Sequence, residues 1–128
     1  MSETFVFARN ALEFEREVRD SLLPLQDVVL TLPPLEPARG RPDFLVTRGA
    51  DAVAVKAMAA RGFSNGYARR RARELAEALP RYGASRAFIV IPDQLYSPAV
   101  DSELVPSVEL TTSSRLPFVV DRALGGPA

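Results

Sequence analysis

A helix-forming segment between two strand-forming segments is the feature that most restricts the fold of this chain. Residues 52–58 (AVAVKAM) and 87–91 (AFIVI) are short and apolar, as buried strands are. Between them, a helix is predicted from the N-cap residues Ser64 and Asn65 to Leu79, just before Pro80. Such a crossover helix places the second strand parallel to a neighbour, with right-handed connectivity. The sequence therefore predicts an α/β fold, with helices packed against a mixed sheet.

The segments upstream supply another helix and two more strands. A capping box at Asn10 and Glu13 predicts a helix that ends at Pro24. Residues 27–32 predict a strand, and the Pro/Gly-rich stretch 33–42 a connection. The segment 43–46 then forms a hairpin with 52–58, around a turn at 47–51. The predicted order is helix, strand, strand, strand, helix, strand.

The C-terminal quarter is predicted to be peripheral. Prolines punctuate it at positions 92, 98, 106, 117 and 127. Two short segments, 108–112 and 118–120, have the composition of a hairpin. With a length of 128 residues, the chain is expected to form a single domain, with its core at about 10–92 and a β appendage at 93–128.

Two absent residue types exclude several kinds of chemistry. The chain has no Cys and no His, so thiol nucleophiles, catalytic triads and Cys- or His-ligated metals are excluded. Its 16 basic and 16 acidic residues balance, so no net charge attracts nucleic acid or membrane. The only lysine is Lys56, and its compact ammonium is not replaced by a guanidinium. Without a leader or a membrane-length apolar run, we expect a cytoplasmic protein with no membrane contact.

Asp43 and Lys56 are the candidate chemical pair. Because strand side chains alternate, Lys56 shares a face with Ala54, opposite Val53 and Val55. Asp43 begins the preceding strand of the hairpin, so it is expected at the same edge. A carboxylate beside an ammonium on adjacent strands suits the handling of a phosphate and a divalent cation.

Pro42-Asp43 on the second strand and Val53-x-Val55-Lys56 on the third resemble the PD-(D/E)XK nuclease superfamily, whose core has the predicted element order. The resemblance implies a restriction-endonuclease-like fold and Mg²⁺- or Mn²⁺-dependent hydrolysis of phosphodiester bonds in DNA, often by a homodimer. It implies that Asp43 and the backbone carbonyl of Val55 ligate the metal, and that Lys56 orients the attacking water or stabilises charge on the phosphoryl oxygens. Glu13 or Glu17 of the first helix would add a further ligand.

Ala54 departs from the motif, because the resemblance expects the second metal-ligating acid there. Three explanations stay open. In the first, an inactivating substitution has replaced the acid. In the second, the chain is a natural non-catalytic module, with the segment after Pro92 as a docking arm for a protein partner. In the third, another acid has taken over the role of metal ligand. The candidates for that role are Asp51, Glu13, Glu17 and Asp93. The first two explanations predict weak metal binding and an inactive or impaired enzyme. A further alternative is that Asp43 and Lys56 are unrelated surface residues of another α/β domain.

Arginines gather in the first half of the second predicted helix. Arg69, Arg70, Arg71 and Arg73 follow Arg61. One interpretation is a solvated face with Arg70–Glu74 and Arg73–Glu77 ion pairs. The other interpretation is a surface that contacts nucleic-acid phosphates. In both pairs the Arg precedes the Glu along the helix, which is the less stabilising order, and cations near a helix N-terminus oppose the helix dipole.

Overall fold

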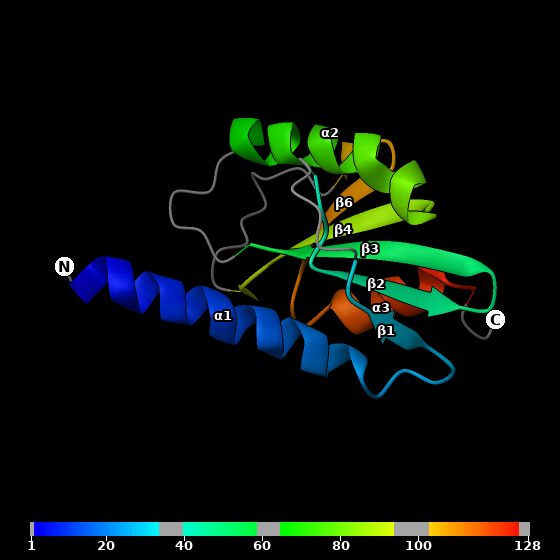
Figure 1. The fold of residues 1–128 in the computed structure, drawn as a ribbon, viewed down its shortest axis with the longest axis horizontal. Helices are drawn as coiled ribbons and strands as arrows, with labels where there is room; N and C mark the ends of the chain where they lie inside the picture. Colours follow the sequence, from blue (N-terminus) through cyan, green and yellow to red (C-terminus); the bar gives the residue numbers. More distant parts are fainter. Residues whose placement is uncertain (1, 34–39, 59–64, 94–102, 126–128) are drawn as a thin grey trace.

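The strands form one mixed sheet. The computed structural model describes residues 2–33, 40–58, 65–93 and 103–125, and over these ranges the strand order is β1-β2-β3-β4-β6-β5. The elements are α1 (Ser2–Leu22), β1 (Val29–Thr31), β2 (Phe44–Arg48), β3 (Asp51–Ala57), α2 (Asn65–Tyr82), β4 (Arg86–Ile91), β5 (Glu103–Val105), β6 (Val108–Thr112) and α3 (Leu116–Ala123). Figure 1 shows their arrangement.

The pairing of the strands confirms the predicted α/β fold. β1, β2 and β3 form an antiparallel meander, with Val46 opposite Val53 in the hairpin. After the α2 crossover, β4 lies parallel to β3, with Val55 beside Phe88. The first six elements therefore have the predicted order and directions.

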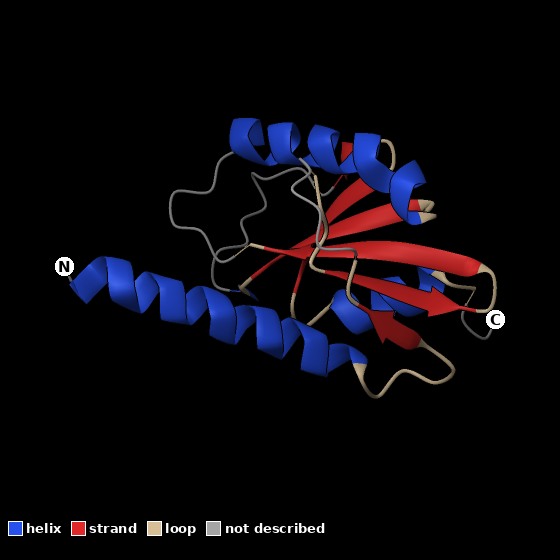
Figure 2. Ribbon diagram, in the orientation of Figure 1, coloured by secondary structure: helices blue, strands red, loops and turns tan. Residues whose placement is uncertain are grey.

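Helices cover both faces of the sheet (Figure 2). On one face, α2 buries Ala68, Ala72 and Leu75 in a cluster with Ala54. On the other face, α1 and α3 pack against a second cluster that contains Val53 and Val55. Both faces of β3 are therefore apolar. Lys56 lies on the same face of β3 as Ala54, as predicted, but that face is apolar. The strand is exposed only toward its ends, at Asp51 and in part at Lys56 and Ala57.

Both long helices extend beyond their predicted ends. α1 begins at Ser2, so the backbone at Asn10 lies inside the helix and not at its N-cap. α2 passes through Pro80 and ends at Tyr82. Pro80 is exposed, and Gly83 then takes a positive φ of 68°, which ends the helix. The predicted N-cap Ser64 lies outside the described residues.

The C-terminal segment differs most from its prediction. β6 lies inside the sheet, parallel to β4, and its Val108 and Leu110 are buried. Residues 118–120 belong to α3 rather than to a hairpin, because Leu116 and Val120 are one helical turn apart and pack against α1 and the sheet. Residues 104–124 therefore contribute to both core clusters, so this part of the chain is not the peripheral appendage that the sequence predicts.

In the described part of the chain, no helix has both the length and the apolar character that crossing a membrane requires.

Candidate functional site

The structure brings Asp43 and Lys56 together at the open end of β3. The Lys56 Nζ lies 3.6 Å from the Asp43 Oδ1, and the two side chains are 38% and 15% exposed. The backbone N–H of Ala57 donates to the Asp43 Oδ2 at 2.7 Å. The Asp43 N–H donates to the Val55 carbonyl oxygen at 2.9 Å, one residue out of the β2–β3 register, in which Val55 lies opposite Phe44. Asp43 is thus held by the backbone of the strand that carries Lys56.

Ala54 lies in the core and not at the edge of an open site. Its side chain is fully buried, and its neighbours across the sheet are Leu45 on β2 and Ala87 on β4. The α2 residues above this face, Ala68 and Ala72, are also fully buried. Small side chains allow α2 to approach the sheet closely, so a longer acid at position 54 would enter a filled apolar layer.

Glu15 is a third member of this site that the sequence prediction missed. Burial raises its pKa, and the Asp43 carboxylate raises it further, while Lys56, Arg19 and Arg41 act in the opposite direction. These couplings place Glu15 within electrostatic reach of both Asp43 and Lys56. We refer to Glu15, Asp43 and Lys56 as the charged triad.

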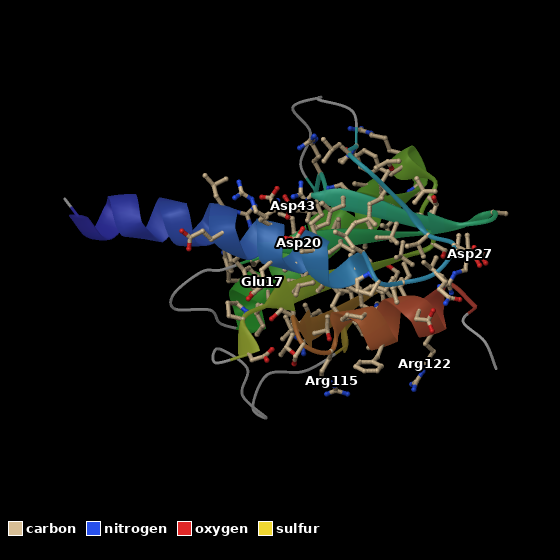
Figure 3. The ribbon with its side chains drawn as sticks, turned by 90° about the horizontal axis from the view of Figure 1, so that it is seen from below. Glu17, Asp20, Asp27, Asp43, Arg115 and Arg122 are labelled. Atoms are coloured by element: carbon tan, nitrogen blue, oxygen red, sulfur yellow. The ribbon has the colours of Figure 1, made fainter. Side chains whose placement is uncertain are left out.

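The helical periodicity of α1 already contained a signal for Glu15. Phe14, Val18 and Leu22 form its buried stripe. At about 100° per residue, Glu15 lies roughly 60° from the centre of this stripe, Glu17 roughly 100° and Glu13 roughly 140°. Glu13 and Glu17 are accordingly exposed, and Figure 3 shows Glu17 and Asp43 on opposite sides of the α1 ribbon.

The other acids considered for position 54 lie elsewhere. Asp51 is exposed at the start of β3, opposite Arg48 in the hairpin register and five residues from Lys56. Asp93 follows β4 and accepts hydrogen bonds from the Ser114 N–H at 3.3 Å and the Ser113 hydroxyl at 3.5 Å. The Ser114 side chain is the main cause of a lowered Asp93 pKa. Neither acid joins the charged triad.

The predicted metal ligands Asp43 and Val55 lie next to each other, joined by the hydrogen bond from the Asp43 N–H to the Val55 carbonyl oxygen. The Asp43 Oδ1 is paired with the Lys56 ammonium, and the Asp43 Oδ2 accepts the Ala57 N–H. Among the described residues, no group of three or more acidic side chains is placed to hold a metal ion. Magnesium binding therefore stays a prediction.

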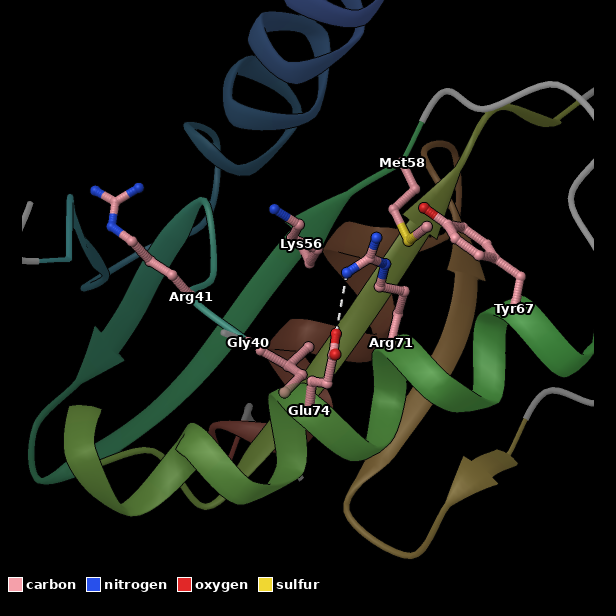
Figure 4. Close-up of a pocket in the computed structure, with 8 residues that line it drawn as sticks. Gly40, Arg41, Lys56, Met58, Tyr67, Arg71 and Glu74 are labelled. Carbon is pink, nitrogen blue, oxygen red and sulfur yellow. Dashed lines mark hydrogen bonds and ion pairs between the residues drawn. The ribbon is translucent and has the colours of Figure 1, made fainter. Parts of the chain in front are cut away.

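A pocket opens beside the triad, between β3 and α2. It has a volume of about 400 Å³, and we call it the Tyr67 pocket. Its lining includes Arg41, Lys56, Met58, Tyr67, Arg71 and Glu74, with Gly40 and Leu75 beside them. Figure 4 shows Arg71 between Tyr67 and Glu74. The Arg71 guanidinium lies 5.2 Å from the centroid of the Tyr67 ring and 3.0 Å from a Glu74 carboxylate oxygen.

The predicted arginine cluster does not share one surface. At about 100° per residue, Arg71 lies roughly 70° to one side of the buried stripe of α2, Arg69 roughly 90° to the other side, and Arg70 nearly opposite the stripe. Glu74 pairs with Arg71 rather than with Arg70. Arg73 and Glu77 are both exposed, and the described contacts do not include the predicted pair between them. Arg61 lies outside the described residues.

Comparisons with known proteins include a distant structural similarity. No protein-family model matches the chain, and no curated protein matches it. Among solved structures, the chain is similar to SfsA of Pyrococcus furiosus, determined in complex with Ca²⁺, with 19% sequence identity and a TM-score of 0.38. The match covers 95% of this chain and 53% of SfsA, so the chain spans about half the length of that protein.

Proposed function

We propose that this chain binds the phosphate backbone of DNA at Lys56 and the arginines around it, as a nuclease-like domain that does not cut. One observation supports this most strongly. The only lysine is partly exposed at the open end of β3 and is held by Asp43, while position 54 beneath it is apolar and fully buried. The phosphate-handling half of the motif is present, and its second acid is absent.

Each side chain of the site has a part in this binding. The Lys56 ammonium attracts a phosphate oxygen, and Asp43 limits the conformations of the lysine before the phosphate arrives. Arg41 and Arg71 line the adjoining pocket and extend the cationic surface. Hydrolysis needs in addition an activated water, which this motif obtains from a metal held by two acids. Ala54 provides no oxygen for that metal.

A titration of fluorescein-labelled DNA, followed by anisotropy between 50 and 200 mM NaCl, tests the binding. Affinity should fall steeply with salt, because cations of the protein replace counterions on the phosphates. Lys56→Gln should weaken binding to all sequences equally and reduce the salt slope by about one. Arg122→Gln, on the exposed side of α3, is the matched control and should bind as the unmodified chain does. Absence of binding at 50 mM NaCl, or equal loss in both variants, would overturn the proposal.

A second candidate function is hydrolysis with Glu15 as the replacement acid. It is favoured by the electrostatic coupling of Glu15 to Asp43 and Lys56. Incubation of supercoiled plasmid with Mg²⁺ or Mn²⁺ separates the two candidates. The binding proposal predicts no nicking above a metal-free control. Nicking that disappears in both Glu15→Gln and Lys56→Gln would instead establish the second candidate.

A further inference from the structure

We infer that the Tyr67 pocket receives the terminal nucleotide of a DNA strand that carries an end phosphate. This rests on the proposed function and adds the part of the DNA that is recognised. The first support is the size and lining of the pocket. At about 400 Å³, it lies in the roughly 300–1,000 Å³ range of small-ligand sites. Tyr67, Met58 and Leu75 give it an apolar wall with an aromatic ring, on which a base can stack.

The charges of the lining favour an end phosphate over an internal one. Three cations line the pocket: Lys56 and Arg71 are each paired with one carboxylate, Asp43 and Glu74, and the Arg41 guanidinium donates to the Pro33 carbonyl oxygen at 3.0 Å. A phosphate monoester carries about −1.5 to −2 charges at neutral pH, more than the single charge of a backbone diester. Arg71 is held in place by Glu74 and by the Tyr67 ring, so little conformational entropy is lost when it binds an anion.

The backbone at Gly40 lines one side of the pocket. Gly40 has a φ of 76°, and a Cβ at this position would overlap the carbonyl oxygen of Glu74 on α2. The segment before β2 therefore lies directly against the helix backbone, with no room for a side chain between them. A strand that enters beside Lys56 meets this contact on the Gly40 side of the pocket. On that side, the contact favours the end of a strand over a continuous chain.

The two methionines of the sequence make the pocket observable. Only Met1 and Met58 are present, and Met58 lines the pocket. In the full chain labelled with ¹³C at the methionine methyl groups, a 5′- or 3′-phosphorylated thymidine octamer should shift the Met58 signal. The same octamer with hydroxyl ends, and a circular single strand without ends, should leave it unchanged. The favoured phosphorylated octamer should bind about tenfold more tightly than its hydroxyl form, as expected for one added charged hydrogen bond.

Variants of the pocket complete the test. Tyr67→Leu and Arg71→Gln should both remove the preference for an end phosphate. Tyr67→Leu should leave binding of circular DNA within about twofold, whereas Arg71→Gln should also weaken it, because Arg71 belongs to the cationic surface. Arg81→Gln, exposed near the end of α2, is the matched control and should keep the preference. Equal affinity for circular, hydroxyl and phosphorylated DNA would overturn the inference and leave the proposed backbone binding intact. Absence of binding to every DNA would overturn both.

Discussion

Glu15, Asp43 and Lys56 hold two negative charges and one positive charge at the mouth of the proposed DNA site. Asp43 is fixed by an ion pair and a backbone N–H, whereas Glu15 is partly buried and its pKa is raised. The ionised form of Glu15 is therefore less favourable in the folded chain than in water. This excess of negative charge opposes the approach of a phosphate to Lys56.

Glu15→Gln should raise the temperature of thermal unfolding at pH 7. The folded pKa of Glu15 lies above its unfolded value of 4.5, so its ionisation destabilises the fold above the folded pKa and has no effect below about pH 4.5. The gain in unfolding temperature should therefore vanish as the pH falls through this window. DNA affinity should increase about twofold, because one negative charge beside Lys56 is removed. Glu17→Gln, exposed on α1, is the control, and an equal gain in both variants would contradict the coupling.

Ala54→Glu should destabilise the fold rather than restore a metal site. The new carboxylate would enter a filled apolar layer beneath α2, and overpacking with polar burial costs roughly 2 kcal/mol or more. Urea unfolding measures the loss. Ala50→Glu makes the same change at an exposed position of the β2–β3 turn and should change the free energy of unfolding by less than about 0.5 kcal/mol. A stable Ala54→Glu variant that nicks plasmid with Mg²⁺ would instead support an inactivating substitution at this position.

Local sequence pattern determines the positions of some strands and helices, and tertiary packing determines the positions of the others. The β2–β3 hairpin and the parallel β3–α2–β4 unit follow their predicted order, because alternation, helical spacing and turn residues all lie within the segments concerned. β6 and α3 do not, because the composition of 108–120 fits a hairpin equally well. Pairing with β4 and contact with α1 decide their places.

Leu110 and Phe118 test the place of the C-terminal segment. Both belong to the hairpin that the sequence predicts, but Leu110 is 3% exposed on β6 and Phe118 is 76% exposed on α3. Leu110→Ala should lower the free energy of unfolding by about 2–5 kcal/mol. Phe118→Ala should change it by less than about 0.5 kcal/mol. Urea unfolding measures the free energy of unfolding of both variants. Similar small losses of this free energy in both would indicate that the segment is peripheral, as the sequence predicts.

The molecule as a whole is neutral, and its cationic surface is local. The 16 basic and 16 acidic residues leave no net field, so attraction of DNA depends on where charges gather. The fold places the Tyr67 pocket and the charged triad next to each other, at the end of β3 between α1 and α2. On the far side, Arg48 joins β2 to α3 through Asp121 at 2.7 Å and also donates to the Gln26 carbonyl oxygen at 3.0 Å. That arginine serves the fold rather than the proposed DNA surface.

The sequence by itself determined the order of the first six elements, the parallel crossover and the meeting of Asp43 with Lys56. Each depends on periodicity within a segment or on the register of one hairpin. Helical spacing already placed Glu15 and Arg71 near the buried stripes of their helices and Arg70 opposite its stripe. Only the tertiary structure decided that the Glu15 flank of α1 faces Asp43 and Lys56, that Ala54 lies beneath α2, and that Arg71 lines the pocket. These depend on which flank of a helix faces which strand. The orientation of each helix on the sheet depends on burial of apolar surface over the whole chain, and residue spacing within one segment carries little information about that orientation.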